Sequence, residues 1–244
     1  MNMKRRTQKF TIVELLIVIS ILCILASLLM PAMNKAIERA RCISCVNNMK
    51  QLGNSSAFYM QDFDDWVITT GWASNAHPER GYHWFYALSK FSGFSISSSF
   101  CPSRQNDYWT LKARNYNLEE FGHGNSYGQD TAQFAHYSHN LIGFGQDVSG
   151  TTWKSIKSGN VKNTAAILFS EGIQANRKYG TWRLHLPQYS ATQMALWAYH
   201  NSGTGCNYLA FDGRVVTWQT SGGGEAGSQR LHNEKKNLFE SLKK

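Results

Sequence analysis

The sequence predicts an α+β protein in which a long N-terminal helix packs on an antiparallel β-sheet. A nearly unbroken apolar run over residues 10–33 is followed by an amphipathic stretch that reaches residue 60. Short apolar runs typical of β-strands and an Asp-Gly turn lie near the C-terminus. The residues between these two parts are rich in glycine, serine and asparagine, which indicates a loop-rich domain.

The apolar run is long enough to cross a membrane. Its 24 residues, Phe10 to Met33, would span about 36 Å as a helix, and a hydrocarbon core is about 30 Å thick. A leader of residues 1–9 precedes the run and carries a net charge of +4. Because excess positive charge keeps its side of a span in the cytoplasm, we expect a transmembrane helix over residues 10–33 with a cytoplasmic N-terminus.

Glu14 is the only charged residue in the run. A carboxylate in a membrane segment is unfavourable, and it is usually retained because it has a partner of opposite charge. The alternative is a side chain that reaches the membrane interface from near the end of the helix.

The segment KFTIVELLIVI, from Lys9 to Ile19, resembles the N-terminal cleavage and methylation motif of type IV prepilins and type II secretion pseudopilins. In that family a dedicated peptidase cuts before the phenylalanine, the new N-terminus is methylated, and the glutamate neutralises the amine of a neighbouring subunit. The resemblance implies cleavage between Lys9 and Phe10, N-methylation of Phe10 and an assembly role for Glu14. Pro31 matches the family's helix-kinking proline, which lacks an N–H and clashes with the preceding turn.

The resemblance also implies a pilin-like fold and a non-enzymatic function. The protein would be a major or minor structural subunit of a type IV pilus-like or type II secretion-like filament. Its partners would be copies of itself or other pilin-like subunits, the prepilin peptidase and an inner-membrane assembly platform. It would pass once through the bacterial inner membrane, with its C-terminal domain periplasmic or extracellular. An uncleaved signal anchor is the alternative, because the family has glycine where this chain has Lys9.

Residues 34–60 are expected to continue the same helix. Their apolar residues recur mostly at three-residue steps among basic and amide side chains: Ile37, Ala40, Ile43, Met49 and Leu52. The acidic cluster at residues 61–65 lacks the spacing of a calcium-binding loop, so we expect a solvated turn that ends the helix. Residues 61–220 would form the globular domain, which is almost neutral although the whole chain carries +9, and residues 221–244 a flexible tail.

The predicted strands are short, and the clear ones lie late in the chain. Phe100–Ser103 has the pattern of a brief strand stopped by Pro102, and clearer strands are expected at residues 165–170, 208–211 and 215–218. Asp212 and Gly213 separate the last two, and Asp-Gly between apolar runs indicates a β-hairpin. Loops are expected to dominate residues 66–160.

Four cysteines lie outside the membrane run, namely Cys42, Cys45, Cys101 and Cys206. In an oxidising compartment they predict at least one disulfide, and we prefer Cys45–Cys101, which would join the helix to the domain. The spacing Cys42-x2-Cys45 is also compatible with zinc or a redox motif, but no second cysteine or histidine pair follows at finger spacing. His136 and His139 lack a third ligand. The sequence therefore predicts neither a metal site nor a cofactor.

The passage from His200 to Val215 resembles a C-terminal signature of many prepilin-like proteins, a histidine followed by Asp-Gly. Eleven residues stand between His200 and Asp212 here, where the signature has nine. A structural role is expected, with Asp212 and Gly213 forming the turn and His200 hydrogen-bonded to a neighbouring loop.

Nucleophile-elbow, phosphate-loop and dinucleotide motifs are absent from the sequence. The 8 tryptophans and 11 tyrosines leave a second function open, because exposed rings stack on sugars or single-stranded nucleic acid. The alternative function is thus a non-polymerising, membrane-anchored domain that binds glycan or DNA through its aromatic residues. Aromatic side chains that fill the core of a loop-rich domain are the simpler interpretation.

Overall fold

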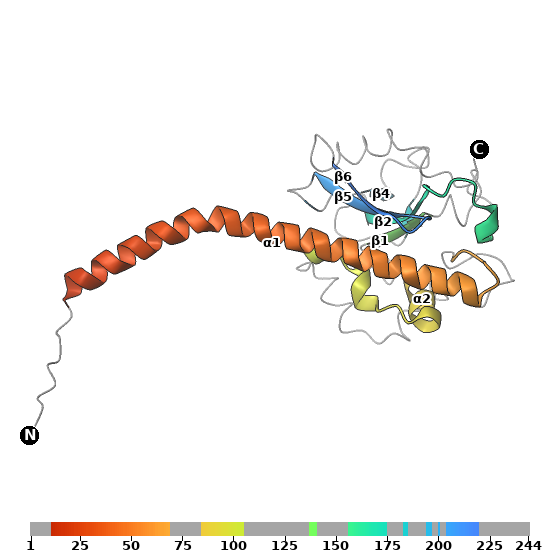
Figure 1. Ribbon diagram of the computed structural model, residues 1–244, viewed down its shortest axis with the longest axis horizontal. Coiled ribbons are helices and arrows are strands. Elements are labelled where there is room, and N and C mark those ends of the chain that lie inside the picture. The colour runs from red at the N-terminus through yellow and green to blue at the C-terminus, as the bar shows by residue number, and fades with distance from the viewer. Residues whose placement is uncertain are drawn as a thin grey trace, which may run out of the picture. The chain divides into compact units, whose positions relative to one another are not determined.

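In the computed structural model, the parts that can be described are residues 11–68, 84–104, 137–140, 156–174, 183–184, 194–196, 200 and 204–219. The chain divides into two compact units, Met1–Ala40 and Arg41–Lys244. The long helix α1, Ile12–Asp62, contributes its first part to one unit and its second part to the other (Figure 1).

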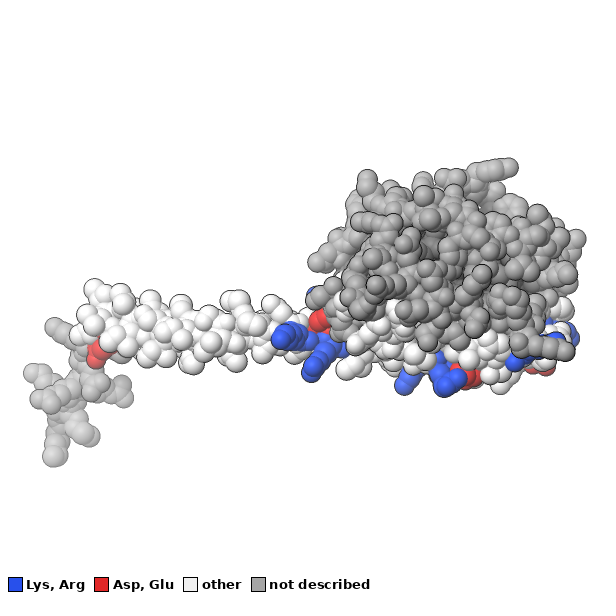
Figure 2. All heavy atoms as spheres, turned by 90° about the horizontal axis from the view of Figure 1, so that it is seen from above, with Lys and Arg blue, Asp and Glu red and all other residues white. Residues whose placement is uncertain are grey.

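The first part of α1 has the surface of a membrane helix. Its large apolar side chains, from Ile12 to Met33, are all exposed, and Figure 2 shows this stretch as uncharged apart from one acidic side chain near its N-terminal end. Its two hydroxyls are satisfied within the helix, because Ser20 donates to the carbonyl of Leu16 and Ser27 to that of Ile24, both at 2.7 Å. The helix is thus long and apolar enough to cross a membrane, as the sequence predicts.

The helix ends where the acidic cluster begins. Its last residue is Asp62, and the following Asp64 and Asp65 have positive φ angles of 51° and 62°. This left-handed backbone cannot continue a right-handed helix, and aspartate tolerates it better than most residues do. The Asp64 carboxylate forms an ion pair with Lys157. The predicted turn is therefore present, and the helix extends two residues beyond the expected end at residue 60.

The second unit contains a largely antiparallel sheet, which makes the fold α+β as predicted. Strands β2 (Ile167–Gln174), β5 (Gly205–Ala210) and β6 (Val215–Gln219) form its antiparallel centre, with β5 between the other two (Figure 1). Strand β1 (Tyr137–Asn140) pairs antiparallel with β2 on its other side. Two very short strands complete the sheet: β3 (Arg183–Leu184) runs parallel to β1, and β4 (Met194–Leu196) pairs antiparallel with β2.

The hairpin between β5 and β6 has the turn that its Asp-Gly sequence predicts. Gly213 has a φ of +84°, and the Asp212 carboxylate accepts hydrogen bonds from both the backbone N–H and the side chain of Arg214. The hydrogen bond from the Arg214 side chain lowers the pKa of Asp212. The turn thus combines a glycine in a left-handed conformation with a local Asx contact.

Replacing Gly213 by alanine should destabilise the domain by about 1–2 kcal/mol, because a Cβ is disfavoured at this φ. No atom lies within 4 Å of the added methyl, so backbone strain is the only expected cost. Gly159→Ala is the matched control, since Gly159 also has open space and an ordinary φ. Urea unfolding of both variants measures the difference, and equal midpoints would contradict this account of the turn.

The second part of α1 packs against the sheet through one face, formed by Cys45, Met49, Leu52, Ser56 and Tyr59. These residues recur at alternating steps of four and three, the spacing of one helix face. Gly53 brings the backbone close to β5, because a Cβ there would lie 3.2 Å from Leu209.

The predicted apolar stripe was partly wrong. Met49 and Leu52 are buried, but Ile37 is 41% exposed and Ile43 is 69% exposed. Steps of three residues turn only 300° around a helix, so such a series drifts off one face after a few members. The buried face of the helix instead begins at Cys45, a residue that the predicted apolar stripe did not include.

Two elements differ from the predicted loops and strands. Helix α2, Trp84–Ser92, lies within the region expected to be loop, and its Trp84, Phe85 and Leu88 are buried. The strand expected at Phe100–Ser103 is absent: the 3-10 turn η1 (Ile96–Ser99) ends just before it, and a second 3-10 turn, η2 (Pro102–Arg104), begins at Pro102. Pro102 has no N–H for a strand ladder, and its fixed φ suits the start of a turn.

Aromatic side chains build much of the core of the second unit. The ring of Trp84 lies edge-on to Phe169 of β2 with centroids 4.8 Å apart, and Tyr59 stacks on Phe63 at 4.5 Å. Tyr137, Phe85 and Phe94 are also buried. In the described residues, then, the aromatic content serves mainly as core, which favours the simpler interpretation of the composition.

Candidate functional site

The N-terminal end of α1 holds the first candidate site. Glu14 lies in the first turn of the helix, and its Oε2 accepts hydrogen bonds from the backbone N–H of Thr11 at 2.9 Å and from the Thr11 hydroxyl at 2.7 Å. The hydroxyl in turn accepts a hydrogen bond from the N–H of Glu14 at 3.2 Å. Thr11 and Glu14 therefore form a capping box, with the threonine as N-cap and the glutamate at the third helical position.

The capping box gives Glu14 a structural role that the sequence analysis did not consider. Lys9 and Phe10 lie outside the described residues, so the expected cleavage site is not part of this geometry. Pro31 lies inside α1, which continues through it. Since proline has no N–H, the helix lacks the hydrogen bond that residue 31 would otherwise give to the carbonyl of Ser27.

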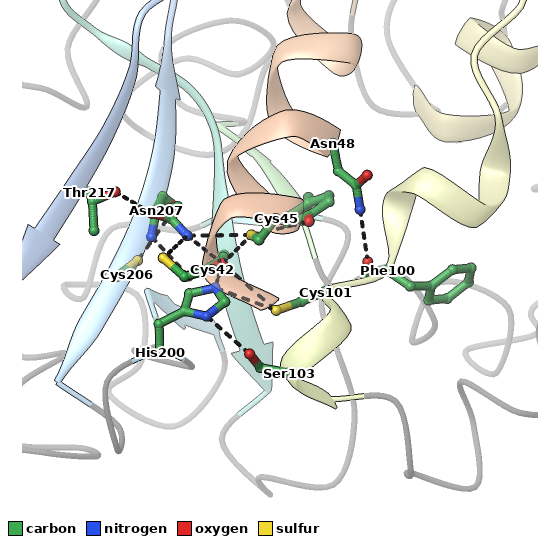
Figure 3. Close-up of polar contacts among 12 residues, drawn as sticks. Cys42, Cys45, Asn48, Phe100, Cys101, Ser103, His200, Cys206, Asn207 and Thr217 are labelled. Carbon is green, nitrogen blue, oxygen red and sulfur yellow. Dashed lines mark hydrogen bonds and ion pairs between the residues drawn. The ribbon is translucent and has the colours of Figure 1, made fainter. Parts of the chain in front are cut away.

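The second unit contains a buried polar cluster that joins four segments of the chain (Figure 3). Cys45 comes from α1, Cys101 from between η1 and η2, Glu171 from β2, and His200 from the bridge that precedes β5. All four residues are 0% exposed. One ligand-type atom from each lies within 4.8 Å of the others, so the four side chains converge on one point. We call these four residues the Cys-Cys-Glu-His cluster.

Glu171 is the hub of the Cys-Cys-Glu-His cluster. Its Oε1 lies 2.6 Å from the Cys45 sulfur, 2.7 Å from His200 Nε2 and 3.9 Å from the Cys101 sulfur. The Cys101 sulfur lies 3.6 Å from the same nitrogen of His200. The other carboxylate oxygen of Glu171, Oε2, accepts a hydrogen bond from the backbone N–H of Asn207 at 2.8 Å, which fixes the orientation of the carboxylate.

A second layer of polar groups holds the cluster in place. The Tyr137 hydroxyl donates to the Cys45 sulfur at 3.2 Å, and Asn207 Nδ2 donates to the same sulfur at 3.4 Å. The Asn207 amide is itself oriented by Thr217, whose hydroxyl donates to its Oδ1 at 2.7 Å. On the far side of the imidazole, His200 Nδ1 lies 3.0 Å from the Ser103 hydroxyl (Figure 3).

Burial and the cluster's own charges shift its pKa values strongly. Burial raises the pKa of Cys45 well above its usual range, and the nearby Cys101 thiol and Glu171 carboxylate raise it further. Burial also raises the pKa of Cys101. Burial lowers the pKa of His200, but its contacts with Cys45 and Glu171 outweigh that effect and raise the pKa to about 11. The histidine is thus a cation paired with the buried carboxylate.

The expected disulfide is not formed. All five cysteines are free thiols in the structure, although the preferred pair, Cys45 and Cys101, does meet in the Cys-Cys-Glu-His cluster. Cys42 is half-buried one turn before Cys45, with its sulfur 3.9 Å from Asn207 Nδ2, and Cys206 is buried with its sulfur 3.6 Å from the carbonyl of Asn207. Cys42 and Cys45 therefore both contact Asn207 Nδ2, but only Cys45 belongs to the Cys-Cys-Glu-His cluster.

His200 and the hairpin residues occupy separate places. His200 bonds the loop that carries Ser103, as a structural role would require, while Asp212 and Gly213 form the β5–β6 turn. His136 and the side chain of His139 lie outside the described residues.

Glu171 is the functional residue that the sequence analysis missed. The signal was present, because Glu171 is the only charged residue in the strand ILFSEGIQ. A buried strand carries such a charge only where a partner compensates it.

Comparison with known proteins identifies no relative: no family model, curated protein or solved structure matches the chain.

Proposed function

We propose that the protein is a structural subunit of a type IV pilus-like or type II secretion-like filament that assembles through the first part of α1. The observation that carries this proposal is the exposed apolar surface of that part together with its single carboxylate at the N-terminal end. A helix that is apolar on all sides needs lipid or other apolar helices around it. A bundle of identical helices would supply such surroundings after the subunit leaves the membrane.

The proposed mechanism is assembly, and it uses three chemical features of the segment. Cleavage between Lys9 and Phe10 would create a new amine at the start of the apolar run. In the filament, Glu14 of one subunit would neutralise the Phe10 amine of its neighbour, since an unpaired charge in an apolar core is strongly unfavourable. Pro31 would let the helix bend during packing. The partners would be further pilin-like subunits, the prepilin peptidase and an inner-membrane platform.

The alternative of an anchored domain that binds glycan or DNA receives no comparable support from the described residues. Most of their large aromatic side chains lie in the core, and Phe58, at 56% exposure, is a single exposed ring on α1. A binding platform for sugars or bases needs several exposed rings on one face.

Mass spectrometry of the membrane-extracted protein tests the first step of the proposal. We expect a mature chain that begins at Phe10 and carries one methyl group on its amine, in cells with an active prepilin peptidase. The matched control is the same strain without the peptidase, where the chain should retain residues 1–9. A chain that keeps its leader in both strains would support the signal-anchor alternative instead.

A further inference from the structure

We propose that Cys45, Cys101, Glu171 and His200 form a structural zinc site inside the globular domain. The proposal concerns the second unit alone and is independent of filament assembly. It rests on the convergence of four ligand-type side chains, on their complete burial and on the second layer of donors around them.

The donor set selects the metal. Two thiolates, one imidazole and one carboxylate are the groups that bind zinc in proteins, whereas calcium and magnesium require mostly oxygen ligands. Four protein ligands that are all fully buried leave no position open to water or substrate. A closed four-coordinate site of this kind is structural rather than catalytic.

The spacing of the ligand atoms fits a tetrahedral ion after a small adjustment. Zinc binds sulfur at about 2.3 Å and nitrogen or oxygen at about 2.0–2.2 Å, which places tetrahedral neighbours roughly 3.3–3.8 Å apart. The Cys101 sulfur already lies 3.6 Å from His200 Nε2 and 3.9 Å from Glu171 Oε1. Glu171 Oε1 would need to withdraw by about 1 Å from the Cys45 sulfur and from His200 Nε2 to admit the ion.

The second layer would stabilise a zinc-bound thiolate at Cys45. The Cys45 thiol donates to Glu171 Oε1, and once zinc replaces that proton, the hydrogen bonds that Tyr137 and Asn207 donate to the sulfur would stabilise its negative charge. Ser103 lies at His200 Nδ1, so with Nδ1 protonated the lone pair of Nε2 faces the ion. This outer arrangement is what metal-ligating histidines and thiolates generally require.

The charge of the bound site follows from a proton count. Binding of Zn²⁺ would release three protons to solvent, one from each thiol and one from the imidazolium, with no change of oxidation state. The bound site would then hold two thiolates, one carboxylate and a neutral imidazole around a dication, which leaves one net negative charge. The donors of Tyr137 and Asn207 spread that charge.

The bound ion would link α1 to the sheet and to the segment between η1 and η2 that carries Cys101. Its ligands come from four separate segments of the chain, and Glu171 lies 126 positions after Cys45. Since such a site does not exist in the unfolded chain, the binding free energy of zinc becomes folding free energy. The ion would thus join the helix to the domain, the role expected for the predicted Cys45–Cys101 disulfide.

Elemental analysis of the full-length protein in detergent tests this site. We expect about one zinc per chain in the wild type and less than about a tenth of that in Cys101→Ser and His200→Ala. Cys42→Ser and Cys206→Ser are matched controls and should keep their zinc, because neither sulfur belongs to the Cys-Cys-Glu-His cluster. Tyr137→Phe removes only one donor to Cys45 and should weaken zinc binding about 10–100-fold.

Measurements on the wild-type protein test the zinc site even if the variants do not fold. Protein exchanged with cobalt(II) should show the charge-transfer absorption of a thiolate-bound tetrahedral ion, and removal of the metal by a chelator should lower the unfolding midpoint reversibly. A wild-type protein without metal, with Cys45 and Cys101 found in a disulfide by alkylation and peptide mapping, would overturn the proposal. Loss of zinc in Cys42→Ser with retention in Cys101→Ser would also overturn it.

Discussion

The variant Glu14→Gln should reach the membrane and fold normally but fail to assemble. Glutamine keeps the hydrogen bond to Thr11 that completes the capping box, because either residue serves at that helical position. It lacks the negative charge that would compensate the amine of a neighbouring Phe10. An uncompensated amine in an apolar helix bundle is strongly unfavourable, so we expect recovery of assembled protein to fall about tenfold or more. Glu14→Ala should lose both the cap and the assembly.

Thr11→Val is the complementary control. It removes the hydroxyl of the capping box and keeps the carboxylate of Glu14, so the first turn should weaken while assembly persists. The measurement is recovery of cross-linked or sheared filament at equal membrane levels, with the mature N-terminus of each variant checked by mass spectrometry. Normal assembly of Glu14→Gln, together with failure of Thr11→Val, would show that Glu14 acts only as a cap.

The variant Phe169→Ala should destabilise the globular domain by about 3–5 kcal/mol, the range for removal of a buried aromatic ring. Phe169 is 0% exposed, and its ring lies edge-on to Trp84 at 4.8 Å between centroids. The loss would remove both the apolar burial and this ring contact. Because whole domains are stable by only about 5–15 kcal/mol, the variant should unfold at a much lower urea concentration.

Phe58→Ala makes the same chemical change at an exposed position. Phe58 is 56% exposed on α1, and alanine is a better helix former, so the free energy of unfolding should change by less than about 0.5 kcal/mol. Unfolding by urea, followed by tryptophan fluorescence, compares the two variants. A similar cost at both positions would contradict the aromatic core.

The elements that the sequence predicts well are those with a strong local signal. The apolar run, the acidic end of α1 and the Asp-Gly hairpin each depend on neighbouring residues, and all three are present. Strand β2 was predicted but placed too early, since the structure starts it at Ile167 and ends it at Gln174. Helix α2 was missed, because nine residues are too short a stretch for a periodic pattern to stand out among loops.

The buried cluster could not be predicted from local sequence patterns. Sequence patterns point to Cys45, Cys101 and His200, each for a different reason, but they do not indicate that these residues lie together. Their proximity depends on how α1, β2 and the segment before β5 pack, which spacing along the chain does not encode. Glu171 was overlooked because a single charge in an apolar strand has no partner nearby in sequence.

The order in which the chain is made has a consequence for the two thiols of the cluster. Cys45 and Cys101 are synthesised well before Asn207, which lies 162 residues after Cys45. Contacts between such distant residues form late, because long loops must close first. During that interval the thiols have neither His200 nor the donors of β5 around them. An early disulfide between them would trap the domain before its last strands have paired, so the timing of thiol oxidation relative to folding would decide how much protein reaches the folded state.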